Sequence, residues 1–417
     1  MSLTKSRARR AVRRAEHVDF EGVKDPRERG RHNHQGLLRL LVVALASAKR
    51  ALRAVESVGD DLSRTTLRKL GLTKAPSDTL LYQLLATQPL VGFAQVLVRQ
   101  VKTALLHKHI ENDLFEEGVV AIDGKAVWSG IFAADPHCRE QTENGRTYHV
   151  LMAQRACLVS SSARPCVTQR LIAKSAGEAD TFKLTFGFLM KNFRRSFEVI
   201  THDAGGVSRE NARLVNEAGK AYVFAVKGNQ PRVHMAAQSR LGCKENDGDA
   251  ARIGETFTQE RVDGALLRRE IWRCSVQADD PEIEFAGARQ LWRVRQTATR
   301  TLPGGSVEHT VEDRYVISNR VFSAQKALTL LRLHWGIENG PNWTMDVVHG
   351  EDAGSPCRNG RGVAVTSWLR LLAYNLVSMW RRKLPPRRDE GVATWERACA
   401  TLERALYFDR MDLVTLA

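Results

Sequence analysis

The chain has 417 residues, of which 43% are hydrophobic and 26% charged, so it is long enough to build a substantial core and wholesale disorder is excluded. Its formal net charge of +16 indicates a polyanionic partner, most often nucleic acid, although a generally basic soluble protein is the alternative. Seven scattered cysteines without a CxxC pair argue against a disulfide framework and a zinc ribbon, and they fit a reducing cytoplasm. The apolar runs are too short to cross a bilayer, which argues against a membrane protein.

The N-terminal part of the chain divides into two predicted segments. Residues 1–35 are predicted to form a flexible basic arm, because MSLTKSRARRAVRRAEH has six Lys and Arg and no acid before Glu16. An arm that contacts phosphates is favoured over a transit peptide. Residues 36–112 are predicted to form a helical domain, since GLLRLLVVALASAKRALRAVESVG is apolar at helical spacing and Ser77 or Asp78 can cap a further helix. This domain serves either packing or DNA contact.

Strand and helix patterns then alternate in the order β-β-β-α-β-α-β. The predicted elements are strand 116–130, strand 147–161, strand 165–175, helix 179–193, strand 196–202, helix 208–219 and strand 221–231. This order predicts an α/β fold with a mixed sheet and helices on both faces. The first strand is expected to end at Asp123 and Gly124, and Asp203 follows the fourth strand. If these strands are neighbours, the two carboxylates face each other.

The C-terminal half begins with a change of pattern. Residues 232–321 are predicted to be a β-rich insertion made of hairpins, because strand-like runs flank an Asp-Gly turn and a Pro-Gly-Gly turn. Helices are expected over 323–340, capped by Ser323, and over 360–383. A basic run with two prolines ends the second of these helices, and 386–417 is predicted to hold a tail helix.

Three acids stand out from this pattern. A lone Asp at a strand end is usually a turn residue, and a helical Glu is usually solvated surface. Asp123 and Asp203, however, both follow apolar strands and precede glycine-containing loops, and Glu338 lies in the apolar setting of LHWGIEN. Three converging acids repel one another unless divalent cations bridge them. Two Mg²⁺ or Mn²⁺ ions held by oxygen ligands can grip a phosphodiester, which predicts phosphoryl-transfer chemistry.

The hypothesis also concerns the loop after Asp203 and the choice of the third acid. Gly205 and Gly206 are expected to let the loop after Asp203 turn without crowding the site. Three acids that follow Glu338 are alternative candidates for the third ligand: Asp346, Glu351 and Asp352.

The chain resembles a DDE transposase of a bacterial insertion sequence. The resemblance is to the ISAs-type group, which carries a β-rich insertion before its last catalytic residue. The resemblance rests on four blocks in the family's order: DPRERGRHNHQGLLRLLVVALASA with APSDTLL, AIDGKAV, VITHDAGGVSRENARLVNEAGKAYVFAVKGNQP, and HWGIENGPNWTMDVVHGEDA. It covers nearly the whole chain.

The resemblance implies a ribonuclease-H-like catalytic core over 113–231 and 322–385, interrupted by the insertion at 232–321. It implies Asp123, Asp203 and Glu338 as the catalytic and metal-binding triad for two Mg²⁺ or Mn²⁺ ions. The family's activity is nicking of the element's ends and attack of the freed 3′-hydroxyl on target DNA. The implied partners are double-stranded DNA, as terminal inverted repeats and target, and a second subunit of a homodimer on paired ends. The implied location is the nucleoid in the bacterial cytoplasm.

Several polar residues around the site are candidates for DNA contact, with a solvated or turn-forming role as the alternative. They are Lys125, Lys227, Asn229, His334 and Arg358. Trp272 and Trp292 lie on the predicted hairpins, where core packing is favoured over stacking on a displaced base.

The chain departs from the family pattern at a few positions. Met345 stands where relatives often carry a lysine, Val127 and Trp128 follow the first-aspartate motif where the group usually has an arginine, and Glu178 lacks the preceding asparagine of the group. Two alternatives to an active transposase therefore stay open. One is a catalytically degenerate derivative that only binds DNA, and the other is a non-transposing nuclease on the same core.

Overall fold

The computed structural model describes residues 18–131, 138–243, 255–262, 264–278, 280–302, 304–352, 354–385 and 391–407. The basic segment 1–17, on which the prediction of a phosphate-contacting arm rests, lies outside the described residues. So do residues 386–390 and 408–417 of the predicted tail. Within the rest of that tail, α13 (Trp395–Leu406) is a helix capped by Thr394.

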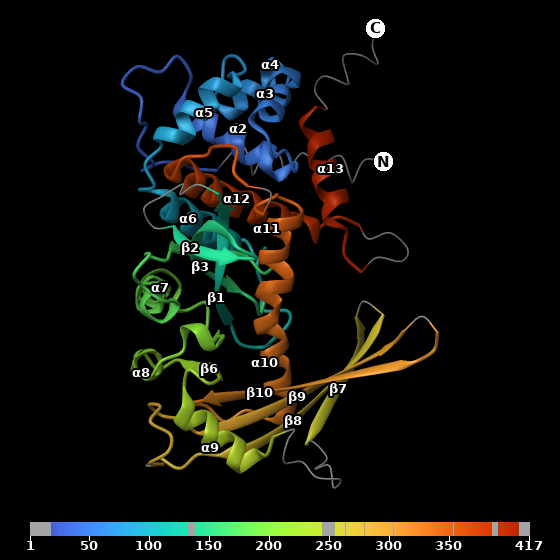
Figure 1. Cartoon of the computed structure of the whole chain (residues 1–417). Helices are drawn as coiled ribbons and strands as arrows, with labels where there is room; N and C mark the ends of the chain where they lie inside the picture. The colour runs from blue at the N-terminus through green and yellow to red at the C-terminus, as the bar shows by residue number, and fades with distance from the viewer. Residues whose placement is uncertain are drawn as a thin grey trace.

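A group of short helices forms the N-terminal region, as predicted. These are α2 (His34–Ala46), α3 (Leu52–Asp61), α4 (Arg64–Leu70), α5 (Asp78–Thr87) and α6 (Phe93–Leu106). Ser77 is the cap of α5, because its side-chain oxygen accepts a hydrogen bond from the backbone N–H of Leu80. In Figure 1 α2 to α5 (blue) lie above the long helix α12 (Gly360–Arg381), which contacts α2, α5 and α6.

The described strands form one ten-stranded mixed sheet. They are β1 (Val119–Gly130), β2 (Arg139–Glu143), β3 (Arg146–Leu158), β4 (Cys166–Leu171), β5 (Val199–His202), β6 (Ala221–Val226), β7 (Thr256–Val262), β8 (Ala265–Ser275), β9 (Gln290–Thr301) and β10 (Val307–Ser318). Their order is β2-β3-β1-β5-β6-β10-β9-β8-β7, with β4 also paired to β3. β1 and β5 are parallel neighbours, which fulfils the condition on which the meeting of the two aspartates depends.

Side-chain alternation along the strands divides the core between the two faces of the sheet. Val119 and Ala121 of β1 pack in the cluster that includes α10 (Ala324–Ile337) and α12, whereas Val120 and Ile122 pack in the cluster that includes α7 (Glu178–Phe193) and α8 (Arg209–Glu217). Figure 1 shows α7 and α8 on one side of the strands and α10 on the other. This arrangement, with the helical N-terminal region, confirms the predicted ribonuclease-H-like fold class.

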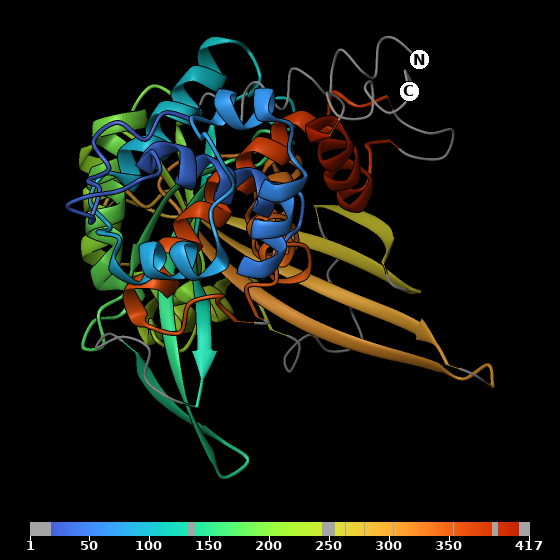
Figure 2. The ribbon, with the colours of Figure 1, turned by 90° about the horizontal axis from the view of Figure 1, so that it is seen from above.

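The predicted hairpins of the second half are present, and they continue the same sheet. β10 is antiparallel to β6, so β10, β9, β8 and β7 extend the sheet outward from the core. Figure 2 shows two long hairpins, β2–β3 and β9–β10, projecting from the body of the molecule. Trp292 is fully buried and donates its ring N–H to Oε1 of Gln290 at 3.0 Å, which confirms packing as its role.

A few predicted boundaries were wrong. β1 does not end at Asp123 but continues to Gly130, because β3 pairs with it as far as His149 opposite Gly130. The segment predicted to be β-rich from residue 232 onward begins inside helix α9 (Pro231–Leu241), whose first position is held by Pro231. α10 ends at Ile337 and passes into the π-helical turn η2 (Glu338–Asn342), which contains Pro341 and leads to α11 (Trp343–Val347). Across the described part of the chain, no helix has the length and apolar character that crossing a membrane requires.

Candidate active site

Asp123 and Asp203 lie side by side on the central strands. In the parallel pairing of β1 and β5, Ile122 is opposite His202, so each aspartate is the residue that follows one member of that pair. Neighbouring strands lie about 4.8 Å apart. By alternation, both aspartates fall on the face that carries α10, the same face to which Thr201 turns its hydroxyl toward His334 of that helix.

Glu338 stands where α10 gives way to η2, and its side chain is accessible to solvent. Partial burial and the charge of Asp203 raise the pKa of Glu338, while Arg314 and Lys227 act in the opposite direction. The guanidinium of Arg314 is held 4.8 Å from the ring centroid of Trp335, one turn earlier in the helix. A carboxylate therefore approaches the two aspartates from α10, with two cationic side chains nearby.

Of the three acids, Asp123 has the pKa that is raised the most. Its burial, together with Asp203 and Glu338, raises its pKa to about 7. One carboxylate oxygen, Oδ2, accepts a 2.8 Å hydrogen bond from the side-chain amide of Asn342, at the end of η2. The crowding of negative charge that the sequence predicted is thus present around Asp123.

Asp203 is held by the histidine that precedes it. Burial alone would raise the pKa of Asp203, but a 2.9 Å hydrogen bond from Nδ1 of His202 and nearby His334 lower it. The tautomer of His202 follows from Gln154, whose Oε1 accepts from the hydroxyl of Thr185, so its Nε2 donates to Nε2 of His202 at 3.2 Å. Nδ1 of His202 therefore carries a proton directed at Asp203, and the imidazole orients Asp203 rather than offering a free ligand atom.

Sequence reasoning missed a fourth acid in this cluster, Glu178. Within the described residues, ligand atoms of Glu178, His202 and Asp203 all lie within 4.8 Å of one another, and this group does not include Asp123 or Glu338. Burial and the charge of Asp203 raise the pKa of Glu178. The available signal was weak, since Glu178 directly precedes the predicted helix 179–193, where acids are common, and it lacks the asparagine that precedes it in the resembled group.

The donor atoms of the site are of the kind that binds a divalent metal ion. Carboxylate oxygens from Asp123, Asp203, Glu338 and Glu178 are the hard ligands that Mg²⁺ and Mn²⁺ prefer. The charge of Asp203 raises the pKa values of the other three, and Oε2 of Glu178 is buried without a hydrogen-bond partner in the described part of the chain. A divalent cation would relieve both features.

The glycines after Asp203 admit close approach, as predicted, although neither needs a left-handed backbone. A Cβ on Gly206 would lie 2.0 Å from Nε2 of His202, and one on Gly205 would lie 3.2 Å from Oε2 of Glu178. Side chains at these positions would displace the groups that surround Asp203.

The three alternative candidates for the third ligand interact with other side chains. Glu351 is fully buried and forms a 2.7 Å ion pair with the fully buried Arg155, so its carboxylate does not reach an open site. Asp346 forms a 2.6 Å ion pair with Lys125. Burial and Asp352 raise the pKa of Asp346, to about 6 despite Lys125. Two of the three alternative acids are therefore paired with cationic side chains, and Glu338 stays the predicted third ligand.

The residues predicted to contact DNA fall into two groups. Lys227 and Arg358 are exposed. Asn229 is also exposed, but its side-chain amide donates to the carbonyl of Ala204 and so ties the loop after β6 to the loop after Asp203. Lys125 is largely buried in its pair with Asp346.

His334 departs from its predicted role. It is buried and hydrogen-bonded to Thr201, and burial with the nearby His202 lowers its pKa to about 4, so the imidazole is neutral near pH 7. Its ring is hydrogen-bonded to β5 two residues before Asp203, and its burial keeps it from contact with a phosphate on the surface. Met345 is also fully buried, so packing accounts for an apolar residue where relatives carry a lysine.

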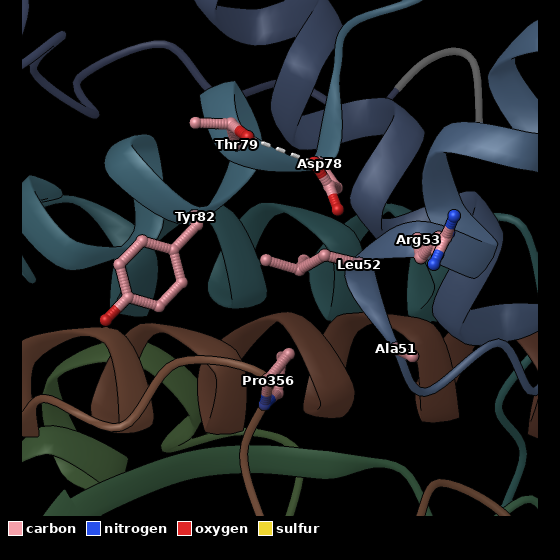
Figure 3. A pocket seen from close by; sticks show the side chains of 7 residues that line it. All are labelled: Ala51, Leu52, Arg53, Asp78, Thr79, Tyr82 and Pro356. Carbon is pink, nitrogen blue, oxygen red and sulfur yellow. Dashed lines mark hydrogen bonds between the residues drawn. The ribbon is translucent and has the colours of Figure 1, made fainter.

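A cavity of about 460 Å³ lies away from these acids, between α3, α5 and the segment before α12 (Figure 3). Its lining includes a single carboxylate, Asp78, which accepts a hydrogen bond from its neighbour Thr79. It offers no second acid for a metal site of the predicted kind.

Comparison with known proteins bears on this arrangement directly. The family model described as "Transposase DDE domain" matches residues 116–376. The chain belongs to the DDE transposase family. The matched DDE segment contains Asp123, Asp203, Glu338 and Glu178, together with β7–β10.

Relatives of this DDE transposase chain carry similar descriptions. "Putative protein YbfL" of Escherichia coli K12 is 27% identical over 277 residues, or 65% of this chain and 66% of the relative. "H repeat-associated putative transposase YhhI" of the same strain is 30% identical over 190 residues, or 43% of this chain and 47% of the relative. "Putative transposase YncI" of Escherichia coli O157:H7 is 30% identical over 182 residues, or 43% and 45%. Each match thus spans less than two thirds of the relative's length.

Proposed function

We propose that this chain is a DNA transposase that nicks the ends of an insertion sequence and joins the freed 3′-hydroxyl to target DNA. Asp123, Asp203 and Glu338 are its proposed metal ligands and catalytic residues. The observation that carries the proposal is the pairing of β1 with β5, since it sets two aspartates side by side on the face where α10 delivers Glu338.

The chain's own side chains have distinct parts in this chemistry. Two Mg²⁺ or Mn²⁺ ions, when bound, would activate the attacking hydroxyl and offset the charge that grows on the leaving oxygen. His202 holds Asp203 and Asn342 holds Asp123, so both aspartates are positioned before substrate arrives. The exposed amine of Lys227, close enough to lower the pKa of Glu338, suits contact with a phosphate.

The finer features of the proposal follow the resemblance to the ISAs-type group. The substrates are terminal inverted repeats and target DNA, the working unit is a homodimer on paired ends, and the protein acts at the bacterial nucleoid. The net charge of +16 supports a polyanionic partner of this kind.

The test is a cleavage and strand-transfer assay on DNA carrying the sequences that flank the gene, with and without Mg²⁺. We expect metal-dependent nicking and joining, abolished by Asp203→Asn and retained by Glu217→Gln, which neutralises an exposed acid on α8. Cleavage without joining would favour the non-transposing nuclease. Binding of the end sequences without any product would favour the degenerate derivative.

A further inference from the structure

Glu178 approaches the catalytic aspartates from the side opposite to Glu338. It is the first residue of α7, which packs on the face of the sheet that α10 does not cover. Its carboxylate nevertheless reaches to within 4.8 Å of ligand atoms of Asp203 and influences the pKa of Asp123. The acids of the site therefore come from both sides of the sheet and meet where Asp123, within β1, lies beside the end of β5.

Two glycines form a cradle for this carboxylate. A Cβ added to Gly124 would lie 2.2 Å from Oε1 of Glu178, and a Cβ added to Gly205 would lie 3.2 Å from Oε2. Gly124 directly follows Asp123, and Gly205 is two residues after Asp203. The two glycines next to the aspartates thus leave room for a carboxylate against the backbone that carries both ligands.

The main chain fixes Glu178 in this place. Gln154 donates from Nε2 to the backbone carbonyl of Glu178 at 2.9 Å, and the same amide nitrogen donates to His202. Asp180 caps the start of the helix by accepting a 2.7 Å hydrogen bond from the N–H of Gly177. The residue that orients His202, and through it Asp203, therefore also anchors Glu178.

The carboxylate itself has an unmet requirement. Oε2 of Glu178 is buried without a hydrogen-bond partner in the described part of the chain, and the carboxylate of Asp203 lies beside it. An acid that served only to stabilise the start of α7 would gain more by facing solvent or the free N–H groups of the helix. A buried, unpaired carboxylate oxygen beside another carboxylate is the arrangement that a bound cation would satisfy.

We propose that Glu178 is a fourth oxygen ligand of the divalent-metal site, shared with Asp203 on the α7 side. The inference rests on the proposed function, because it assumes that Asp203 binds the metal. Four carboxylates would balance the four positive charges of two divalent ions, so the site would be neutral before the phosphate arrives.

The test measures metal binding directly and needs no DNA. Mn²⁺ would be titrated into the full-length protein, with calorimetry for affinity and melting temperature measured with and without the ion. We expect Glu178→Gln to bind Mn²⁺ at least about tenfold more weakly than the wild type. Its melting temperature without metal should equal or exceed that of the wild type, because the substitution removes a buried like charge, while most of the rise produced by Mn²⁺ should be lost.

Two reference variants separate the possible outcomes. Glu217→Gln, an exposed acid on α8, should keep the wild-type affinity and melting-temperature rise. If Asp203→Asn loses Mn²⁺ binding while Glu178→Gln binds like the wild type, Glu178 is not a ligand and the proposed triad stands. If the wild type binds no Mn²⁺, or if Asp203→Asn binds like the wild type, the proposed function fails together with this inference.

Discussion

Asn342 donates a 2.8 Å hydrogen bond to Oδ2 of Asp123, and its Oδ1 lies 3.5 Å from a guanidinium nitrogen of Arg155. Arg155 is the residue opposite Asp123 in the pairing of β1 with β3, and it is fully buried. It also forms the ion pair with Glu351. A buried polar chain thus runs from Glu351 through Arg155 and Asn342 to Asp123.

The first prediction concerns the amide at the end of this chain. Asn342→Ala removes the only hydrogen bond from another side chain to Asp123 that the described residues provide, so the carboxylate loses its fixed orientation. We expect metal affinity or cleavage rate to fall about 10- to 100-fold, as for other residues that orient metal ligands. Asn192→Ala, which alters an amide bonded to the backbone of α7, is the matched control and should leave both unchanged. Equal activity of the two variants would remove Asn342 from the site.

The second prediction concerns the buried ion pair. Arg155→Met should destabilise the protein by about 3–5 kcal/mol, because Glu351 is left buried without its partner. The double variant Arg155→Met with Glu351→Leu should recover a large part of that loss, since neither charge remains. Urea denaturation of the two single variants and the double variant measures the coupling. Additive losses would mean that the pair does not act as a unit.

The third prediction is a pH dependence of stability in the metal-free protein. The pKa of Asp123 is raised from 3.8 to about 7. The folded state therefore binds more protons than the unfolded state between these values, and Asp123 lowers stability progressively as pH rises from about 4 to 7. Asp123→Asn in EDTA should match the wild type near pH 4 and exceed it above pH 7, by at most about 4 kcal/mol. Urea unfolding across this range checks the prediction, and a constant difference would contradict it.

The fourth prediction separates exposed and buried candidates for DNA contact. Lys227→Ala should reduce the slope of log affinity against log salt by about one, because one phosphate contact is lost. His334→Asn should leave the slope unchanged, since His334 is buried and neutral. Lys191→Ala is a charge-matched control at the far end of α7, roughly 20 Å along the helix from Glu178. Equal slopes for the wild type and Lys227→Ala would remove Lys227 from the interface.

The sequence predicted those parts of the fold whose local pattern is strong. Apolar runs marked β1, β3, β5 and β6, and Ser77 and Ser323 marked helix starts, because burial and capping leave a signal within a few residues. β2 was missed, since REQTE is short and polar and is a strand only through its pairing with β3.

The site was predicted less completely than the fold, for a physical reason. Asp123 and Asp203 stand at the ends of apolar runs, where an acid is conspicuous. Glu178 and Arg155 acquire their roles from neighbours far away in the chain, and nothing within a few residues distinguishes Glu178 from an ordinary helix-capping acid. His334 was misread for the same reason, because the burial that neutralises it depends on packing against β5.

The most direct test of the central claim is the position of bound metal. Crystals soaked in Mn²⁺ and measured by anomalous diffraction should show density enclosed by the carboxylates of Asp123, Asp203 and Glu338, beside the end of β5. Manganese bound only elsewhere, or density at this place that survives in Asp203→Asn crystals with undiminished occupancy, would contradict the account.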